Sequence, residues 1–520
     1  MKQDLVWQVG QRMMVGFSGT EVPPALRDLV RRYKIGNVIL FEENVESRAQ
    51  LRSLCAGLQA VILEETGQPA LIAIDQEGGV VSRLKRDCAV APSAMAVAAA
   101  GTPEGAEQAG RITGEELASL GVNFDLAPVL DVNSNPDNPV IGARSYGDTP
   151  EAVCAYGTAM IRGLRGGGVF SCAKHFPGHG DTAMDSHLGL PRVDKSLAVL
   201  ESCELVPFAA AIDAGVDAIM TTHILFSQLD EVPATMSRRI LTDILRERMG
   251  FAGLIVSDCM MMDAIAKEYG SAAGGAAAAA AGVDLICVSH SLETAEQTCE
   301  AILAQTRTRS EREPGGRVEM AASVERILAC KARLPKFLPP EADAAQVRAR
   351  VAQMRALREA SLTPVGDAAR PSLGAHPLFI GCCPFRTTLA SNPVNRTVSF
   401  PKEMQARLGG MALETPVDPG PVDIAAAVRA SAGCSCIVLC TYNGHVKRGQ
   451  LAMLRALAAQ GLPMIAVALR DPYDLCGLPP GVYGLAAYEY SAESLEAVAR
   501  ALRGGFEPRG RLSVRLEARA

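Results

Sequence analysis

The densest group of side chains that could do chemistry lies between Lys174 and His187. This stretch reads Lys-His-Phe-Pro-Gly-His-Gly-Asp-Thr-Ala-Met-Asp-Ser-His and contains three of the seven histidines of the chain. Asp185 and His187 are two positions apart, so in an extended segment both side chains point to the same side. A carboxylate beside an imidazole stabilises the charged ring and raises its pKa. The pair could therefore supply a general acid that works near neutral pH.

A metal site is a different interpretation of this stretch. His175 and His179 have the four-residue spacing of a helical zinc pair. Pro177 and Gly178 interrupt a helix at this point, and no Glu adjoins His175 to act as a base. We therefore expect a loop that leaves the preceding strand, with no metal. An ordered histidine-rich loop without chemistry also fits the pattern.

Asp258 ends a second stretch of interest, in which an apolar run from Gly253 to Ser257 is followed directly by a carboxylate. An Asp at the end of a strand often does no more than cap the next helix. Opposite a His/Asp pair, however, such a carboxylate is a candidate nucleophile or base.

Two further segments could bind a ligand. Asp75 opens the run Asp-Gln-Glu-Gly-Gly, with Arg83 a little further along the chain. Paired glycines let the backbone approach a ligand closely, while Asp75 could accept hydrogen bonds from ligand hydroxyls and Arg83 could donate them. A simple glycine turn is the alternative. Arg144 lies among small and apolar residues of the loop 138–147, which is a weak signal when taken alone.

The elements that position these residues are short apolar runs separated by helical patterns. We expect eight strands, at Met13–Phe17, Asn37–Phe41, Ala70–Ile74, Asn123–Ala127, Phe170–Ala173, Ala218–Thr221, Gly253–Ser257 and Val283–Val288. Helical patterns lie between them, for example at Ser47–Glu65, Pro103–Leu120, Pro150–Arg165, Leu197–Ala214 and Ser237–Met249. Alternating strands and helices favour a parallel sheet, and eight such units predict an α/β fold of the (β/α)8 barrel type. An open doubly wound sheet is the alternative.

Several of the expected strands end in a residue that could do chemistry. The residues at these ends are Asp75, Lys174, His175, Thr222, His223, Asp258, Ser289 and His290. In parallel α/β folds the ligand site lies at the carboxyl ends of the strands. A single His or Asp at the end of one strand would be weak evidence. Polar residues at the ends of several strands together predict one shared site.

A second, smaller domain is expected after the barrel. Pro335, Pro339 and Pro340 mark a linker, and a charged helix follows at Ala344–Glu359. Further strands are expected at Leu378–Cys382, Cys436–Cys440, Met464–Ala468 and Val482–Ala487, with a helix around Gln450–Ala459. We expect a barrel over residues 1–334, a linker with a bridging helix over 335–370, and an α/β sandwich over 371–520.

Taken together, these motifs resemble glycoside hydrolase family 3, in its β-N-acetylglucosaminidase branch. The resemblance runs from Gln8 to Lys331, and the Lys-His-Phe-Pro-Gly-His-Gly-Asp-Thr stretch followed by Asp-Ser-His carries most of it. It places Asp258 at the nucleophile's position, His187 at that of the acid/base and Asp185 at that of its partner. The residues that fall on sugar-binding positions are Asp75, Arg83, Arg144, Lys174 and His175. The second domain is similar to the family's α/β sandwich at Leu469–Leu475 and Pro508–Leu512, though less closely.

The resemblance implies a retaining exo-β-N-acetylglucosaminidase without metal or organic cofactor. Its expected substrate is an N-acetylglucosamine-containing oligosaccharide or a cell-wall muropeptide, and its intermediate a covalent glycosyl-enzyme. Transfer of the sugar to phosphate instead of water is an open alternative, because a neutral imidazole base does not repel an incoming anion. Two different classes of protein also fit the motifs: a carbohydrate-binding protein on a decayed barrel, and a metal-dependent hydrolase. Two positions depart from the family pattern. Val80 stands where an Arg is usual, and Cys259 stands where an Asp or Ala is usual.

Composition excludes several partner classes. The formal net charge is −6 with mixed signs and no polybasic arm, which disfavours nucleic acid and anionic membranes. The first ten residues lack the pattern of a signal peptide, and no apolar run is long enough to span a bilayer. The fifteen scattered cysteines indicate reduced thiols. A cytoplasmic protein is therefore expected, and the sequence predicts no oligomeric state.

Overall fold

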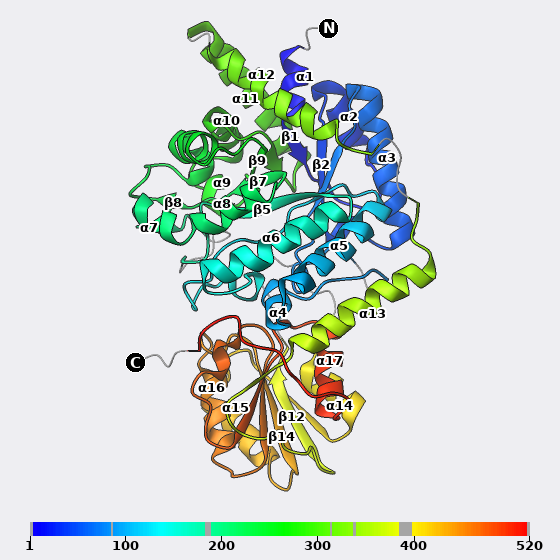
Figure 1. The fold of residues 1–520 in the computed structure, drawn as a ribbon, viewed down its shortest axis with the longest axis vertical. Helices are drawn as coiled ribbons and strands as arrows, with labels where there is room; N and C mark the ends of the chain where they lie inside the picture. The colour runs from blue at the N-terminus through cyan, green and yellow to red at the C-terminus, as the bar shows by residue number, and fades with distance from the viewer. Residues whose placement is uncertain are drawn as a thin grey trace.

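The computed structural model describes residues 4–84, 87–182, 189–312, 315–335, 340–383 and 398–516. Asp185 and His187, the expected acid/base pair, lie outside these ranges. The described residues form a barrel and a second domain built on a separate sheet. The second domain lies next to α4 (Ala94–Ala99) of the barrel, with α13 (Ala344–Ser361) between the two parts (Figure 1).

Parallel strands form the barrel, as the alternating pattern predicted. Their order is β10-β1-β2-β3-β4-β5-β7-β9, and a bridge between Val256 and Leu285 joins the two ends into a nearly closed ring. The strands are β1 (Met13–Val15), β2 (Asn37–Leu40), β3 (Leu71–Ile74), β4 (Phe124–Asp125), β5 (Phe170–Phe176), β7 (Ala218–Thr221), β9 (Leu254–Ser257) and β10 (Ile286–Val288). This closure confirms the barrel and excludes the open doubly wound sheet.

Both faces of the barrel strands are buried, which explains their continuous apolar sequences. Along β3, Leu71 and Ala73 pack with the barrel interior, while Ile72 and Ile74 pack with the surrounding helices. The same alternation holds in β5, where Phe170 faces the interior. Side chains two positions beyond an inward residue therefore also point inward, at the carboxyl ends of the strands.

Helices surround the barrel and begin at capping residues that the sequence contains. Ser47, Thr102 and Thr149 each accept a hydrogen bond from a backbone N–H of the first turn. The helices are α1 (Leu5–Gln11), α2 (Pro24–Tyr33), α3 (Arg48–Thr66), α4 (Ala94–Ala99), α5 (Pro103–Leu120), α6 (Pro150–Gly166), α7 (Leu197–Ser202), α8 (Leu205–Asp213), α9 (Asp263–Ala266), α10 (Ser271–Ala281), α11 (Leu292–Arg312) and α12 (Gly315–Lys331). Short elements complete this part: η1 (Glu42–Asn44), η2 (Gly142–Arg144), η3 (Ala234–Met236), the π-helix η4 (Arg239–Arg248), β6 (Arg192–Val193) and β8 (Leu225–Phe226).

Some expected elements differ from those observed, and three of the differences have a clear structural cause. The helix expected over Leu197–Ala214 is two helices, because Cys203 leaves the helical conformation between them. The helix expected over Ser237–Met249 is a π-helix, and Ser237 Oγ still accepts from Ile240 N at 3.1 Å near its start. Strand β5 runs on to Phe176, because Lys174 N donates to Pro128 O and Thr222 N donates to Phe176 O across the neighbouring backbones.

The second domain contains a mixed sheet between two layers of helices. Its strand order is β11-β16-β15-β14-β12-β13, and β11 is antiparallel to its neighbour. The strands are β11 (Thr363–Val365), β12 (Pro377–Cys382), β13 (Met411–Thr415), β14 (Cys436–Thr441), β15 (Met464–Ala468) and β16 (Val482–Ala486). The helices are α13 (Ala344–Ser361), α14 (Phe400–Leu408), α15 (Pro421–Ala430), α16 (Gly449–Ala458) and α17 (Ala492–Leu502), with the 3-10 turn η5 (Pro472–Leu475).

Helix α13 joins the two parts of the molecule, since it packs on α4 of the barrel and on α17 of the second domain (Figure 1). Arg358 of α13 forms a buried ion pair with Glu489, at 2.6 Å between Nε and Oε1. Ser93 N, at the start of α4, donates to the other oxygen of Glu489 at 3.0 Å. Within the described ranges, no helix is long and apolar enough to cross a membrane.

Candidate active site

The strand alternation places several polar side chains at the carboxyl end of the barrel. Asp75 lies two positions after inward-facing Ala73, and Lys174 lies two after inward-facing Cys172. By the same rule Asp258 follows Val256 on β9. The interior is thus apolar in its lower layers and charged at its mouth.

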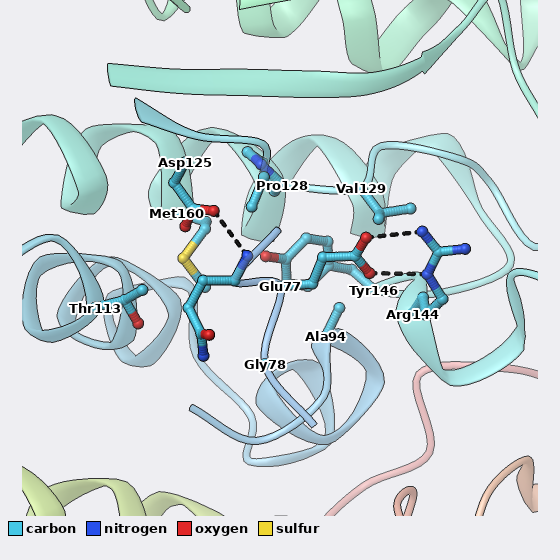
Figure 2. Close-up of a pocket in the computed structure, with 12 residues that line it drawn as sticks. Glu77, Gly78, Ala94, Thr113, Asp125, Pro128, Val129, Arg144, Tyr146 and Met160 are labelled. Carbon is cyan, nitrogen blue, oxygen red and sulfur yellow. Dashed lines mark hydrogen bonds and ion pairs between the residues drawn. The ribbon is translucent and has the colours of Figure 1, made fainter. Parts of the chain in front are cut away.

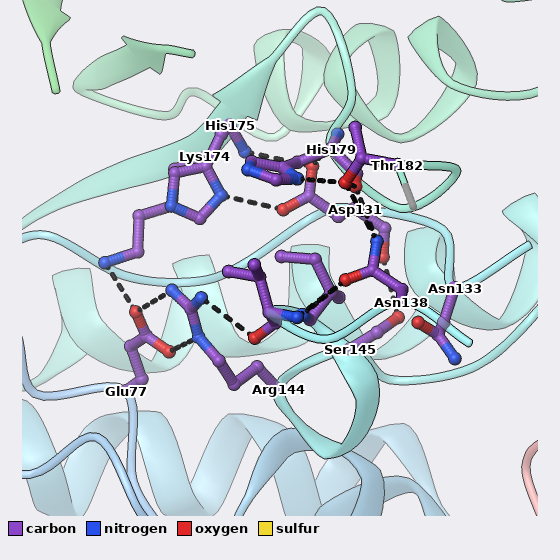
Figure 3. A network of polar contacts seen from close by, with 12 residues as sticks. Glu77, Asp131, Asn133, Asn138, Arg144, Ser145, Lys174, His175, His179 and Thr182 are labelled. Atoms are coloured by element: carbon purple, nitrogen blue, oxygen red, sulfur yellow. Dashed lines mark hydrogen bonds and ion pairs between the residues drawn. The ribbon is translucent and has the colours of Figure 1, made fainter. Parts of the chain in front are cut away.

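An ion-pair network ties the loops after β3 and β4 to strand β5 (Figure 3). Lys174 Nζ lies 2.8 Å from Asp75 Oδ1 and 2.6 Å from Glu77 Oε1. Arg144 donates to both oxygens of Glu77, from Nε at 2.8 Å and from Nη2 at 2.7 Å. Arg83 Nη2 reaches Asp75 Oδ2 at 3.4 Å. Because the Arg144 fork is bidentate, it fixes the orientation of Glu77 as well as its charge.

The network keeps its members ionised despite their burial. Burial disfavours the charged form of Asp75, but Lys174 and Arg83 outweigh it and hold the pKa of this carboxyl below its usual range. Burial likewise opposes ionisation of Glu77, while Arg144 and Lys174 lower its pKa strongly. The same carboxylates raise the pKa of Lys174 against its own burial. The mouth therefore presents fixed charges that can donate and accept hydrogen bonds.

His175 is held by a carboxylate next to the network. Its Nδ1 lies 2.7 Å from Asp131 Oδ2, so Nδ1 donates and the ring orientation is fixed. Burial opposes the charge of Asp131, but the interaction with His175 outweighs it and lowers the pKa of the carboxyl. Burial lowers the pKa of the neighbouring His179 to about 4, and its Nδ1 contacts Thr182 Oγ1 at 2.8 Å.

The two histidines of the zinc-pair interpretation, His175 and His179, lie next to each other, with ring centroids 5.8 Å apart. His175 and His179 each direct Nδ1 to a different partner (Figure 3). Among the residues that the structure describes, no group of three or more His, Cys, Asp and Glu side chains is placed to hold a metal ion.

Asp258 lies at the end of β9, half-buried at the barrel mouth. Its Oδ1 accepts a hydrogen bond from Cys259 N at 2.7 Å, which orients the carboxylate and stabilises its charge. His223, from the end of β7, lies buried beside it, with Nε2 at 3.0 Å from Cys259 O and Nδ1 at 2.8 Å from Thr235 Oγ1.

A cavity lies behind the ion-pair network (Figure 2). Glu77, Arg144 and Asp125 line it, together with apolar side chains that include Met160 and Val129. Burial raises the pKa of Asp125 well above its usual range, although Gln76 N donates to its Oδ1 at 3.0 Å. Neither Asp75 nor Asp258 lines this cavity, so it is distinct from the part of the barrel mouth where those two carboxylates lie.

The second domain contacts the loop that carries Arg144. Asp471 Oδ1 accepts from Ala143 N at 2.7 Å, and Arg470 Nη2 donates to Pro139 O at 3.2 Å. Tyr473 OH accepts from Asn133 Nδ2 at 2.9 Å. These contacts hold the loop after β4 in place from outside the barrel.

The structure brings most of the expected ligand-binding residues together. Asp75, Arg83, Arg144 and Lys174 form one network, and His175 adjoins it on β5. Asp258 enters the same mouth from β9, while Asp185 and His187 lie outside the described residues.

Sequence reasoning gave no role to Glu77 or Asp131, and it noted Asp471 only as part of the Leu469–Leu475 stretch that resembles the family. Glu77 stands two positions after Asp75 beside the glycine pair, and Asp131 ends the apolar run 126–130. Those signals could have found both residues. The contact of Asp471 with Ala143 N joins two domains, so the Leu469–Leu475 stretch alone did not predict it.

Charged side chains that converge at the carboxyl ends of the strands are typical of (β/α)8 barrel enzymes. Residues 6–329 match the family model described as "Glycosyl hydrolase family 3 N terminal domain". The chain therefore belongs to glycosyl hydrolase family 3.

Similar proteins include two bacterial β-hexosaminidases. "Beta-hexosaminidase A" of Pseudoalteromonas piscicida is 38% identical over 337 residues, which cover 61% of this chain and 56% of that protein. "Beta-hexosaminidase" of Pseudomonas aeruginosa is 36% identical over 292 residues, or 56% of this chain and 86% of the relative. The chain thus spans little more than half the length of the first relative and most of the second.

A solved structure resembles the whole chain. The glycoside hydrolase family 3 beta-N-acetylglucosaminidase from Paenibacillus sp. str. FPU-7 is 35% identical, with a TM-score of 0.89, and the match covers 100% of both chains. The likeness therefore extends beyond the barrel to the second domain.

Proposed function

We propose that this chain is a retaining exo-β-N-acetylglucosaminidase that removes terminal N-acetylglucosamine through a covalent glycosyl-enzyme. The observation that carries the proposal is the convergence of Asp258 with the Asp75–Lys174 pair at one end of the barrel. The β-hexosaminidase names of the two relatives and the β-N-acetylglucosaminidase name of the solved neighbour support the same substrate class.

In this proposal the ion-pair network binds the non-reducing sugar. Asp75 accepts hydrogen bonds from sugar hydroxyls, while Lys174 and Arg144 donate them. His175 donates Nδ1–H to Asp131, which leaves Nε2 to meet the ligand. Because the charges are fixed in advance, binding requires little reorganisation of the site.

Asp258 acts as the nucleophile and attacks the anomeric carbon. His187, steadied by Asp185, gives its proton to the departing glycosidic oxygen and later takes one from the incoming water. This pair replaces the second carboxylate of most retaining glycosidases. Support for its role comes from the two-residue spacing of Asp185 and His187.

The natural aglycone follows from the family resemblance. We propose N-acetylglucosamine linked to another sugar, in an oligosaccharide or a cell-wall muropeptide.

All fifteen cysteines lie in the described ranges as thiols and not as disulfides, which supports a reducing, cytoplasmic location.

The test is an assay of 4-nitrophenyl N-acetyl-β-glucosaminide against 4-nitrophenyl β-glucoside, each with and without phosphate. The proposal predicts a clear preference for the N-acetyl substrate, free N-acetylglucosamine as product and β-configuration in the first-formed sugar. If N-acetylglucosamine 1-phosphate were the main product, the reaction would be phosphorolysis and not hydrolysis. Binding of N-acetylglucosamine without turnover would instead support a carbohydrate-binding protein. Loss of turnover when a chelator is added would support a metal-dependent hydrolase.

A further inference from the structure

Cys259 and Cys287 form a pair of thiols beside the proposed nucleophile. Cys259 directly follows Asp258 and donates its backbone N–H to Asp258 Oδ1 at 2.7 Å. Cys287, on β10, belongs to the apolar layer of the barrel interior, and its sulfur lies 3.2 Å from Ser289 Oγ.

The backbones of the two cysteines run side by side. Met260 N donates to Cys287 O at 2.9 Å, and Ser257 N donates to Leu285 O at 2.9 Å, so the chain after β9 continues alongside β10. Neighbouring strands lie about 4.8 Å apart, which is within the Cα separation of about 4.4–6.8 Å that a disulfide spans. Side-chain rotation with a small backbone shift therefore suffices to join the sulfurs.

The two thiols differ in reactivity and access. The Cys287 thiol outweighs burial and lowers the pKa of Cys259 below its usual range, which favours the thiolate of Cys259. The pKa of Cys287 lies well above its usual range because of its contact with Cys259 and its burial. Cys259 is half-buried at the mouth, whereas Cys287 is 2% exposed. Cys259 is thus suited to attack an entering electrophile, and Cys287 to resolve the product.

We propose that Cys259 and Cys287 are an oxidative modification site, which reacts with a hydroperoxide and closes to a disulfide that switches off the adjacent site. The Cys259 thiolate attacks the peroxide O–O bond, which yields the sulfenic acid of Cys259 and releases hydroxide or alkoxide. The Cys287 sulfur then displaces the sulfenic hydroxyl, which leaves as water once it takes up the Cys287 proton. Two thiols are oxidised and one hydroperoxide is reduced.

The disulfide acts on Asp258 through the backbone. It draws Cys259 toward β10 and so disturbs the Cys259 N–Asp258 Oδ1 bond and the bond from His223 Nε2 to Cys259 O, at 3.0 Å. A displacement of about 1 Å at a reacting group can cost roughly a hundredfold in rate. This inference goes beyond the proposed function, and its covalent product is measurable without any activity assay.

The experiment exposes the full-length protein to a small molar excess of hydrogen peroxide, blocks the remaining thiols and digests with trypsin. Cys259 falls in the peptide 249–267 and Cys287 in the peptide 268–307, which also contains Cys299. We expect these peptides to be linked, with fragmentation locating the bond at Cys287. Activity should fall about a hundredfold and return with dithiothreitol, which does not reduce methionine sulfoxide at the neighbouring methionines.

Variants give the matched controls. Cys259→Ser should resist both cross-linking and inactivation, while Cys287→Ser should stop at a sulfenic acid that a dimedone probe labels. Cys154→Ser is the control, because Cys154 is also half-buried but burial raises its pKa, and this variant should behave as wild type. Peroxide-treated wild type that retains both reduced cysteines would overturn the proposal, as would equal sensitivity of Cys259→Ser.

Discussion

Two kinds of carboxylate lie at the barrel mouth. Asp75 and Glu77 are held by Lys174 and arginines, which fixes their charge and direction. Asp258 Oδ1 accepts a hydrogen bond from the backbone N–H of Cys259. Fixed ion pairs suit Asp75 and Glu77 to binding a ligand, and an amide that orients the Asp258 carboxylate suits it to attack on an electrophile. These contacts support separate roles for the two sets in the proposed mechanism.

The acid/base role of His187 predicts a dependence on the leaving group. His187→Ala should slow cleavage of a poor leaving group by about 10²–10⁴-fold, but that of an acidic phenol far less, because such a phenol departs without protonation. Asp185→Asn should move the acidic-group limb of the pH–rate profile downward, since the imidazole loses the carboxylate that raises its pKa. Steady-state rates on a series of aryl N-acetylglucosaminides measure both effects.

His376→Ala is the control for this series, because His376 is exposed in the second domain. Equal slowing of good and poor leaving groups by His187→Ala would assign His187 a structural role.

His179 predicts how the stability of the protein depends on pH. Its pKa is about 4 in the folded protein, against the ordinary 6.5. Below pH 6.5 the unfolded chain takes up a proton that the folded state refuses until about pH 4, so stability falls as the pH falls through this window. The loss amounts to roughly 3 kcal/mol. His179→Gln removes the titration, so its deficit in thermal midpoint relative to wild type should shrink from pH 7 to pH 4.5. A constant or growing deficit would show that His179 does not titrate in this way.

At the scale of elements, the 3-10 turn η2 that carries Arg144 depends on a residue of the other domain. Asp471→Ala removes the acceptor of Ala143 N, at 2.7 Å, and should let the Arg144 loop move. We expect KM to rise about tenfold, the effect of losing one charge-assisted hydrogen bond, with kcat changed much less. Michaelis–Menten kinetics separate the two parameters.

Asp418→Ala is the matched control for Asp471→Ala. It removes a similar bond, from Gly449 N at 2.9 Å, inside the second domain, and should leave KM unchanged. Equal kinetics for the two variants would mean that the second domain does not position Arg144.

The barrel strands could be predicted from the sequence because burial on both faces leaves continuous apolar runs such as Leu71–Ile74. Strand ends then located Asp75, Lys174 and Asp258, since the pleat continues inward beyond the last apolar residue. The partners of these residues could not be predicted so directly. Glu77 pairs with Arg144 across 67 positions of sequence, and only the folded loops bring the two together.

Local helix geometry was also beyond the sequence pattern. Apolar periodicity over Ser237–Met249 indicates a helix, but it does not distinguish an α-helix from the π-helix observed at Arg239–Arg248. Likewise, the loop expected to begin at Lys174 begins only after Phe176, because the neighbouring backbones extend the pairing of β5.

At the scale of the molecule, the buried pair Arg358–Glu489 joins the bridging helix to the second domain and, through Ser93, to the barrel. Arg358→Met should destabilise the protein by about 3–5 kcal/mol, because it leaves the Glu489 carboxylate buried without its cation. The double variant Arg358→Met/Glu489→Gln should recover part of this loss. Thermal unfolding followed by calorimetry measures both. A double variant no more stable than the single one would contradict this account of the junction.

The central claim, that Asp258 is the nucleophile of a retaining glycosidase, is tested most directly by trapping the intermediate. The protein is incubated with a fluorinated N-acetylglucosaminyl fluoride, which forms the glycosyl-enzyme quickly and releases it slowly. Intact mass should increase by one sugar, and peptide mapping should place the sugar on Asp258 within residues 249–267. Asp258→Ala should take up no label and should lose about 10⁴-fold or more in hydrolysis. Labelling of another carboxylate, or turnover of the probe with inversion and no adduct, would contradict the account.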